Sequence, residues 1–168
     1  MKNIELKARI SDPDQARAVC ERIGASFEWR RSQRDIFFRV PPPNRLKLRI
    51  EDGEPPYLIR YDRPSAQGGR ECSYQLLPIR DTCHESCARF FMSALEVAGE
   101  VHKTRELFMW NGIRIHIDEV RGKGSFLEFE CPIGPGGEAK ARETVAALQR
   151  EFGITGSDTV GGSYGEMQ

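Results

Sequence analysis

Apolar and polar residues alternate along several short stretches of this chain. In residues 3–10 every even position is apolar and every odd position is polar or charged. An alternation with period two is typical of a β-strand that has one apolar and one polar face. The same pattern predicts further strands at 45–51, 57–62, 101–108, 113–118 and 126–131. Asn111-Gly112, between two of these stretches, is a strong signal for a hairpin turn.

Three helices are predicted among these strands. The first spans residues 12–24, because its opening Asp-Pro pair supplies an N-cap and a first-turn proline and a glycine ends it. The second spans about 82–98, with Cys87 on its buried face and a glycine directly after it. The third follows Gly136-Gly137 and ends before Gly153. The tail at 155–168 is polar and glycine-rich, and its pattern predicts no element.

The predicted fold class is therefore α+β, with antiparallel strands and helices on their apolar faces. At least five strands have a second face that carries mainly Lys, Arg, Asp and Glu rather than the neutral polar residues that a solvated face accepts equally well. The pattern leaves two interpretations open. The charged faces belong either to an open sheet that meets water or to a closed barrel with a polar interior and helices outside.

Composition narrows the class of protein. The 168 residues include 25 Lys+Arg and 25 Asp+Glu, so the formal net charge is zero. We expect one domain, 1–168. We do not expect a protein that coats nucleic acid or docks on an anionic membrane, because both functions use an excess of basic residues. The odd cysteine count, without C-x-x-C spacing, favours a reducing compartment. With neither a secretory signal nor a membrane-spanning apolar run, a cytoplasmic protein is predicted.

Two carboxylates of the last predicted strand are candidate metal ligands. Glu128 and Glu130 lie two residues apart, so their side chains share one face at a spacing of about 7 Å. Together with Glu5 and Asp118 they would form an all-oxygen cluster of the kind that binds Mg²⁺ or Mn²⁺. The alternative is that each acid pairs with a base on a neighbouring strand.

Basic residues recur in pairs on the charged faces. Bases two positions apart occur at Lys7/Arg9, Lys47/Arg49 and Lys103/Arg105. Guanidinium groups bind phosphate oxygens bidentately, and cations beside a metal are what phosphoryl transfer requires. The sequence contains no G-x-x-x-x-G-K-[ST] segment, which excludes a P-loop. His116 shares the charged face with Asp118 and is either an acid/base residue or a hydrogen-bond partner of a carboxylate. Trp29 and Trp110 are predicted to be packing residues.

Taken together, these stretches resemble the CYTH superfamily. This superfamily comprises triphosphate tunnel metalloenzymes, among them class IV adenylate cyclases, thiamine triphosphatases and inorganic triphosphatases. The opening Ile4-Glu5-Leu6-Lys7 is similar to the superfamily's E-x-E-x-K first strand. The resemblance continues through 46–49, 103–105, 114–120, 126–130 and 162–164. The Arg-Ile-His-Ile-Asp-Glu-Val run at 114–120 looks most like proteins grouped with class IV adenylate cyclases.

The resemblance implies an antiparallel eight-stranded tunnel that holds a small-molecule triphosphate and Mg²⁺ or Mn²⁺. It implies these metal ligands: Glu5, Glu128 and Glu130, assisted by Asp118. The candidate phosphate-binding residues are Arg9, Lys47, Arg49, Arg60, Lys103, Arg105 and Arg114. The candidate catalytic residues are Lys7, Asp118 and His116, with Lys7 contacting the phosphate or positioning the nucleophile.

Two positions depart from the superfamily pattern. Asn3 stands where the first Glu of E-x-E-x-K is usual, which removes a charge. Asp62 stands where a Lys often precedes a proline, and either Arg60 or Arg63 substitutes for it.

Three functions follow from the resemblance. The first is a cyclase that converts ATP into cyclic AMP and pyrophosphate. The second is a triphosphatase acting on thiamine triphosphate, inorganic triphosphate or nucleoside triphosphates. The third is a non-catalytic nucleotide- or polyphosphate-binding module, favoured by Asn3. Either a monomer or a homodimer is compatible with each.

Overall fold

A computed structural model describes residues 2–62, 70–80, 83–162 and 164–166 of the chain. The strands are β1 (Lys2–Ile10), β2 (Ser26–Phe38), β3 (Arg45–Glu51), β4 (Tyr57–Asp62), β5 (Arg70–Pro78), β6 (Val97–Trp110), β7 (Ile113–Val120) and β8 (Gly124–Pro132). The helices are α1 (Pro13–Arg22), α2 (His84–Ala94) and α3 (Gly137–Glu151), followed by the short 3₁₀ turns η1 (Gly156–Asp158) and η2 (Tyr164–Glu166). None of the helices in these ranges combines the length and apolarity needed to span a bilayer.

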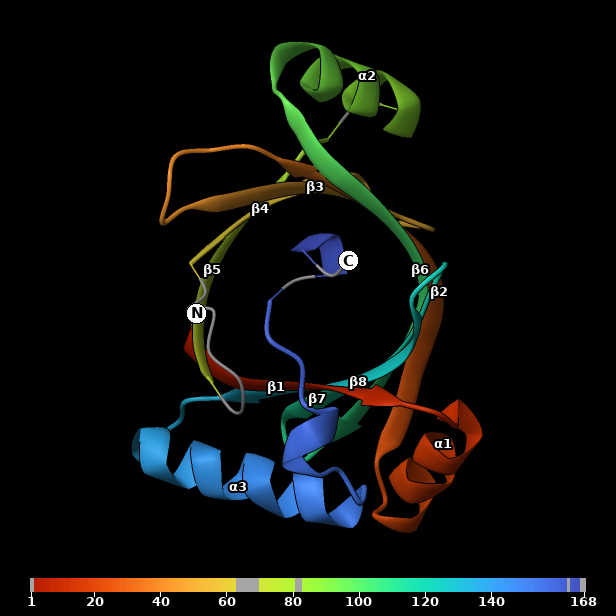
Figure 1. The fold of residues 1–168 in the computed structure, drawn as a ribbon, viewed down its shortest axis with the longest axis vertical. Coiled ribbons are helices and arrows are strands. Elements are labelled where there is room, and N and C mark those ends of the chain that lie inside the picture. The colour runs from red at the N-terminus through yellow and green to blue at the C-terminus, as the bar shows by residue number, and fades with distance from the viewer. Residues whose placement is uncertain (1, 63–69, 81–82, 163, 167–168) are drawn as a thin grey trace.

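The eight strands form a closed antiparallel barrel (Figure 1). Their order around the barrel is β1-β5-β4-β3-β2-β6-β7-β8. Closure comes from β1, which pairs with β5 along one edge and with β8 along the other. The predicted α+β tunnel is confirmed, and the open sheet is excluded.

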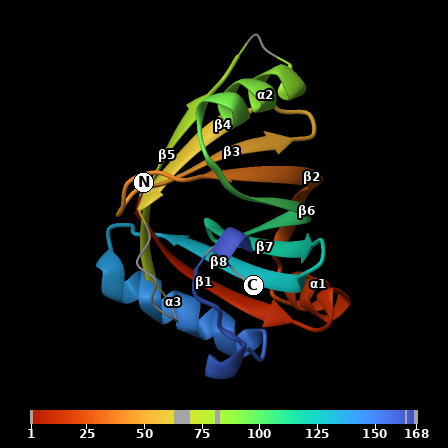
Figure 2. The same ribbon diagram turned by 45° about the horizontal axis from the view of Figure 1, so that its top comes forward.

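The barrel is apolar outside and charged inside. On β1, Ile4 and Leu6 pack into a core with residues of α1 and α3, including Cys20 and Val145. A second core lies under α2, where Leu48 of β3 is fully buried. Figures 1 and 2 show α1 and α3 on one side of the barrel and α2 on the opposite side. Because strand side chains alternate between faces, covering the apolar faces with helices turns the charged faces inward.

The N-cap of α1 and the turn between β6 and β7 form where the local sequence predicts them. The side chain of Asp12 accepts hydrogen bonds from the backbone amides of Asp14 and Gln15, which confirms it as the N-cap of α1. Asn111 and Gly112 both have positive φ, 49° and 79°. These angles suit a two-residue hairpin turn and set the register between β6 and β7.

The predicted end of the second helix is wrong. It was expected to reach residue 98, but α2 ends at Ala94 and β6 already includes residues 97–99. Leu95 is extended, and Val97 pairs with Phe38 of β2. Pairing with a long neighbouring strand therefore overrides the helical spacing of the apolar residues. Cys87 is buried as predicted, and the expected helix start at residue 82 lies outside the described residues.

The C-terminal tail enters the barrel. The amide of Val160 donates to the carbonyl of Lys7 at 2.9 Å, and Thr159 forms a bridge with Ala8, so this segment follows β1. From there the chain turns inward, and η2 lies inside the ring of strands (Figure 1). Tyr164 is buried, with its ring 4.9 Å from that of Phe126.

Candidate functional site

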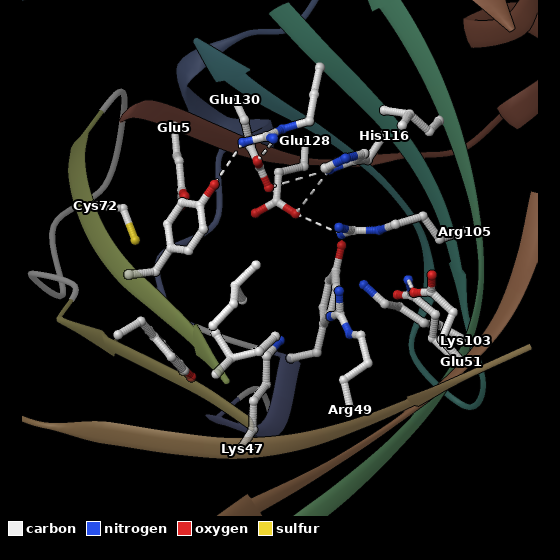
Figure 3. A pocket seen from close by; sticks show the side chains of 18 of the residues that line it. Glu5, Lys47, Arg49, Glu51, Cys72, Lys103, Arg105, His116, Glu128 and Glu130 are labelled. Atoms are coloured by element: carbon white, nitrogen blue, oxygen red, sulfur yellow. Dashed lines mark hydrogen bonds and ion pairs between the residues drawn. The ribbon is translucent and has the colours of Figure 1, made fainter. Parts of the chain in front are cut away.

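The charged faces of the strands surround a cavity of about 320 Å³ inside the barrel (Figure 3). Its cationic lining residues are Lys7, Lys47, Arg49, Lys103, Arg105 and Arg114. Its acidic lining residues are Glu5, Glu51, Glu128 and Glu130. The barrel thus brings together most of the residues that the sequence pointed to, from β1, β3, β6, β7 and β8.

Asp118 holds two of these cations. Its carboxylate accepts from Lys103 at 2.9 Å, from Arg105 at 2.6 Å and from the hydroxyl of Tyr164 at 2.7 Å. Burial alone would raise the pKa of Asp118, but Arg105 and Lys103 outweigh it and hold that pKa well below its usual range. The carboxylate is therefore ionised and fixes the direction of both cations.

Asp35 of β2 does the same for the cations of β3. It accepts from Lys47 at 2.8 Å and from Arg49 at 2.6 Å, and it is almost fully buried. Sequence reasoning missed Asp35 because β2 was not recognised as a strand. The available signal was weak, because only Ile36 and Phe38 form an apolar pair two positions apart beside Asp35.

The far wall of the cavity carries an acidic cluster. Glu128 contacts Lys7 at 3.3 Å and Arg105 at 2.8 Å, while Glu130 contacts Arg114 at 2.9 Å. Glu5 lines the same cavity and is paired in register with Glu130.

His116 completes this cluster. One atom each from His116, Glu128 and Glu130 lie within 4.8 Å of one another, a spacing compatible with a bound metal ion. Burial, followed by the charge of Arg105, lowers the pKa of His116, which favours the neutral imidazole that a metal ligand must be. Its buried Nδ1 has no hydrogen-bond partner among the described residues. The residues therefore fit a divalent cation.

Asp118 is not part of this cluster. The metal-compatible group among the described residues consists of His116, Glu128 and Glu130, whereas the oxygens of Asp118 are engaged by two cations and a tyrosine. In this geometry the carboxylate of Asp118 orients the cations Lys103 and Arg105.

Two predicted phosphate-binding residues lie away from the cavity lining. Arg60 points outward and is exposed, with its guanidinium donating to Asn44 at 3.1 Å, so the expectation that it faces the interior is wrong. The reason is the alternation of β4, which turns Tyr57, Ile59 and Tyr61 inward instead. Arg9 is exposed near one end of β1 and donates to the carbonyl of Lys123. The alternative to Arg60, residue 63, lies outside the described residues.

Aromatic residues line part of the cavity. Trp29, expected to be a packing residue, belongs to the lining, with the guanidinium of Arg31 4.7 Å from its ring centre. Trp110 packs against the outer core and donates to the carbonyl of Ile23. The hydroxyl of Tyr74 accepts from Arg114 at 3.0 Å inside the cavity. The barrel interior thus offers flat apolar surface beside its charges.

Asn3 is buried at the position that departs from the E-x-E-x-K pattern. It is 1% exposed, pairs in register with Cys72 and Pro132, and its side-chain nitrogen has no hydrogen-bond partner among the described residues.

Comparisons with known proteins agree with this geometry. The CYTH domain family model matches residues 1–164. A Methanocaldococcus jannaschii protein named "Putative adenylate cyclase MJ0240" is 24% identical over 177 residues, covering 100% of this chain and 99% of its own. The PH1012 protein of Pyrococcus horikoshii has a TM-score of 0.83 at 22% identity, with 98% of each chain covered. HpAC1 from Hippeastrum, for which a dominant triphosphatase activity is stated, has a TM-score of 0.61 at 15% identity, covering 90% of this chain and 88% of that one. Both structures share the fold.

Proposed function

Because the chain belongs to the CYTH domain family, we propose that it is a metal-dependent enzyme whose substrate is a small-molecule triphosphate. The observation that carries this proposal is the cavity itself. Lysines and arginines from several strands line one enclosed space and face a cluster of carboxylates and an imidazole. A triphosphate carries about four negative charges near neutral pH, and several convergent cations are what such a chain of phosphates requires.

We assign phosphate binding to the basic residues that are already oriented by carboxylates. Arg49 and Arg105 each donate two hydrogen bonds to an aspartate, and a guanidinium has five donors, so each retains donors for a phosphate. Lys47 and Lys103 lie beside them as further donors, each held by the same aspartate as its arginine. Because these groups are held in place before the substrate arrives, little reorganisation is needed when phosphates bind.

Glu128, Glu130 and His116 would hold a divalent cation, with Glu5 adjacent on β1. When bound there, Mg²⁺ or Mn²⁺ neutralises charge on the phosphate oxygens during transfer. Lys7 lies 3.3 Å from Glu128, next to this cluster. We place Lys7 where it contacts the phosphate nearest the cation or orients the attacking oxygen.

The favoured reaction is that of a class IV adenylate cyclase. The ribose 3′-oxygen of ATP attacks the α-phosphorus, its proton passes to a base or to water, and the bond to pyrophosphate breaks. The name of the M. jannaschii relative supports this choice. The second candidate is triphosphate hydrolysis, in which water attacks the terminal phosphorus, and the activity stated for HpAC1 supports it. Both reactions use the same cations, so the outcome depends on which phosphorus faces the nucleophile.

A ³¹P NMR time course tests the proposal. Purified protein is incubated with ATP, inorganic triphosphate or thiamine triphosphate, in Mg²⁺ or Mn²⁺ and with a chelated control. Cyclic AMP plus pyrophosphate identifies the cyclase, and orthophosphate plus the shortened substrate identifies the triphosphatase. Intact substrates in every mixture would contradict an enzyme and favour a binding module.

A matched pair of variants ties any activity to the site. Glu130→Gln removes a cavity carboxylate that binds Arg114, whereas Glu138→Gln removes an exposed carboxylate on α3. We expect turnover to fall at least about a hundredfold in the first variant, as for other groups that organise charge in an active site, and to stay unchanged in the second. Equal activity of the two proteins would refute the assignment.

A further inference from the structure

The nitrogen of His116 that faces the acidic cluster is an anomaly of the cavity wall. The residue is 4% exposed, and its Nδ1 has no hydrogen-bond partner among the described residues. Leaving a buried polar atom unsatisfied lowers the stability of the folded protein. Natural proteins therefore keep such an atom mainly where an ion, a water or a ligand supplies its partner.

Nδ1 is directed at the two carboxylates of β8. It lies 3.5 Å from Oε1 of Glu130 and 3.8 Å from Oε2 of Glu128 (Figure 3). These separations exceed the usual N–H···O distance of about 2.7–3.2 Å. They fall within the separations of about 3.0–4.2 Å that ligand atoms keep from one another around an ion bound at about 2.1 Å. The three groups are thus spaced as ligands rather than as mutual hydrogen-bond partners.

Both carboxylates keep capacity for an ion. Glu130 uses Oε2 for Arg114, which leaves Oε1 facing His116. Glu128 binds Arg105 through Oε2 and Lys7 through Oε1, and each carboxylate oxygen has a second lone pair for an ion. The register between β7 and β8 sets His116 directly opposite Glu128. The pairing of these two neighbouring strands therefore fixes the relative positions of the two side chains.

We propose that His116 is a nitrogen ligand of the metal site formed with Glu128 and Glu130, and that this mixed donor set makes the site bind Mn²⁺ more tightly than Mg²⁺. The inference deepens the proposed function, on which it rests for the presence of a metal. Mg²⁺ favours oxygen ligands and retains several waters, whereas imidazole suits transition metals. An all-carboxylate wall would lack this preference.

The test is made on the whole protein without nucleotide. Mn²⁺ is added, and pulsed electron paramagnetic resonance is used to look for ¹⁴N coupling from a directly bound imidazole. We expect that coupling in the native protein and its loss in His116→Asn. The matched control is His102→Asn, because His102 is exposed on β6 and faces Glu100 instead.

Affinities give a second readout. Titration with Mn²⁺ and with Mg²⁺ should show that His116→Asn weakens Mn²⁺ binding at least about tenfold and Mg²⁺ binding less than about threefold, as expected when one metal ligand is lost. His102→Asn should change neither. Absence of ¹⁴N coupling in the native protein, which requires no variant to fold, overturns the proposal, as does an unchanged Mn²⁺/Mg²⁺ ratio in a folded His116→Asn protein. Since no substrate is present, ¹⁴N coupling without triphosphate turnover would contradict the proposed function alone.

Discussion

Asp35 and Asp118 have equivalent parts on different strands of the barrel. Each is buried, and each accepts from a lysine and an arginine that stand two positions apart on a neighbouring strand. One carboxylate therefore serves each Lys-x-Arg pair. The aspartates hold these basic groups close together in fixed directions, so the arrangement exists before any anion binds.

Replacing Asp118 by asparagine should destabilise the fold strongly. The change leaves Lys103 and Arg105 buried without the carboxylate that now holds both, and breaking a buried ion pair on one side costs about 3–5 kcal/mol. Urea denaturation followed by circular dichroism measures the free energy of unfolding. Glu138→Gln, on the exposed face of α3, serves as the control and should change it little. Similar unfolding midpoints for the two variants would contradict a structural role for Asp118.

Binding of inorganic triphosphate should weaken above pH 8 because of Lys47. Burial, followed by the charge of Arg49, lowers the pKa of Lys47 to about 8, against the opposing effect of Asp35. The ammonium is thus increasingly lost between pH 7 and 9.5, and with it a charge-assisted bond to phosphate. Calorimetric titration without metal should show affinity falling about tenfold over this range.

Lys47→Arg is the control for this pH effect, since a guanidinium stays protonated throughout. Ionisation of the ligand affects both proteins equally, so the difference between their pH profiles isolates Lys47. Parallel profiles would show that Lys47 does not titrate against bound phosphate. The lowered pKa also means that the fold disfavours the protonated amine. In the window from about pH 8 to the unfolded value of 10.5, Lys47 therefore adds stability as pH rises.

The tail from η1 to η2 depends on a close contact inside the barrel. A Cβ atom added at Gly165 would lie 2.8 Å from the ring of Phe37, which is itself buried. Gly165→Ala should therefore displace the tail, at a cost of about 1–3 kcal/mol. Hydrogen exchange of the Val160 amide, which bonds to Lys7, should become about tenfold faster.

Gly156→Ala provides the matched comparison for the tail. It makes the same change in η1, where an added Cβ meets nothing within 4 Å. Exchange at Val160 should be unaffected by it. If both variants exchange alike, the tail is not held by the fit between Gly165 and Phe37.

Strand and helix patterns predicted most of the architecture. The alternation identified the positions of β1, β3, β4, β6, β7 and β8, and the inner face of each except β4, because a strand with one apolar face leaves a period of two in the sequence. β2 and β5 were not recognised. The first half of β2 is a mostly polar and exposed ribbon, so no apolar face marks it.

The candidate site was predictable where the charged face of a recognised strand is also its inner face. Glu128, Glu130, Lys47, Arg49, Lys103 and Arg105 follow in this way, whereas Asp35 was missed together with β2. Arg60 lies outside the cavity because β4 is an exception among the recognised strands. Its charged face turns outward, and its inner face is largely aromatic. Tyr164 could not be placed, since its contacts depend on a tail that has no periodic pattern.

The barrel interior as a whole holds its charges in balance. Its lining cations are Lys7, Lys47, Arg49, Lys103, Arg105 and Arg114, and Arg31 binds Glu51 beside them. They are nearly matched in number by the carboxylates Glu5, Asp35, Glu51, Asp118, Glu128 and Glu130. A triphosphate alone would leave this enclosed space strongly negative. A divalent cation that enters with it offsets part of that charge, so the two ligands should bind cooperatively.

This balance predicts a preference for the metal complex of the ligand. Imidotriphosphate, whose bridging nitrogens resist hydrolysis, should bind at least about tenfold more tightly as its Mn²⁺ complex than without metal, a coupling of about 1.4 kcal/mol. Calorimetry at constant ionic strength measures both affinities. A simple basic surface would show the reverse order, because the metal-free anion is more negative. That order in the data would contradict a balanced, metal-dependent site.

The position of β1 in the barrel affects the nascent chain during synthesis. This strand is synthesised before the other seven strands, yet its partners are β5 and β8 rather than β2. At about 5–20 residues per second, a ribosome needs several seconds or more to reach residues 124–132. Throughout that time the apolar face formed by Ile4, Leu6 and Ala8 lacks its final cover. We therefore expect the first ten residues to be where nascent-chain chaperones engage this protein.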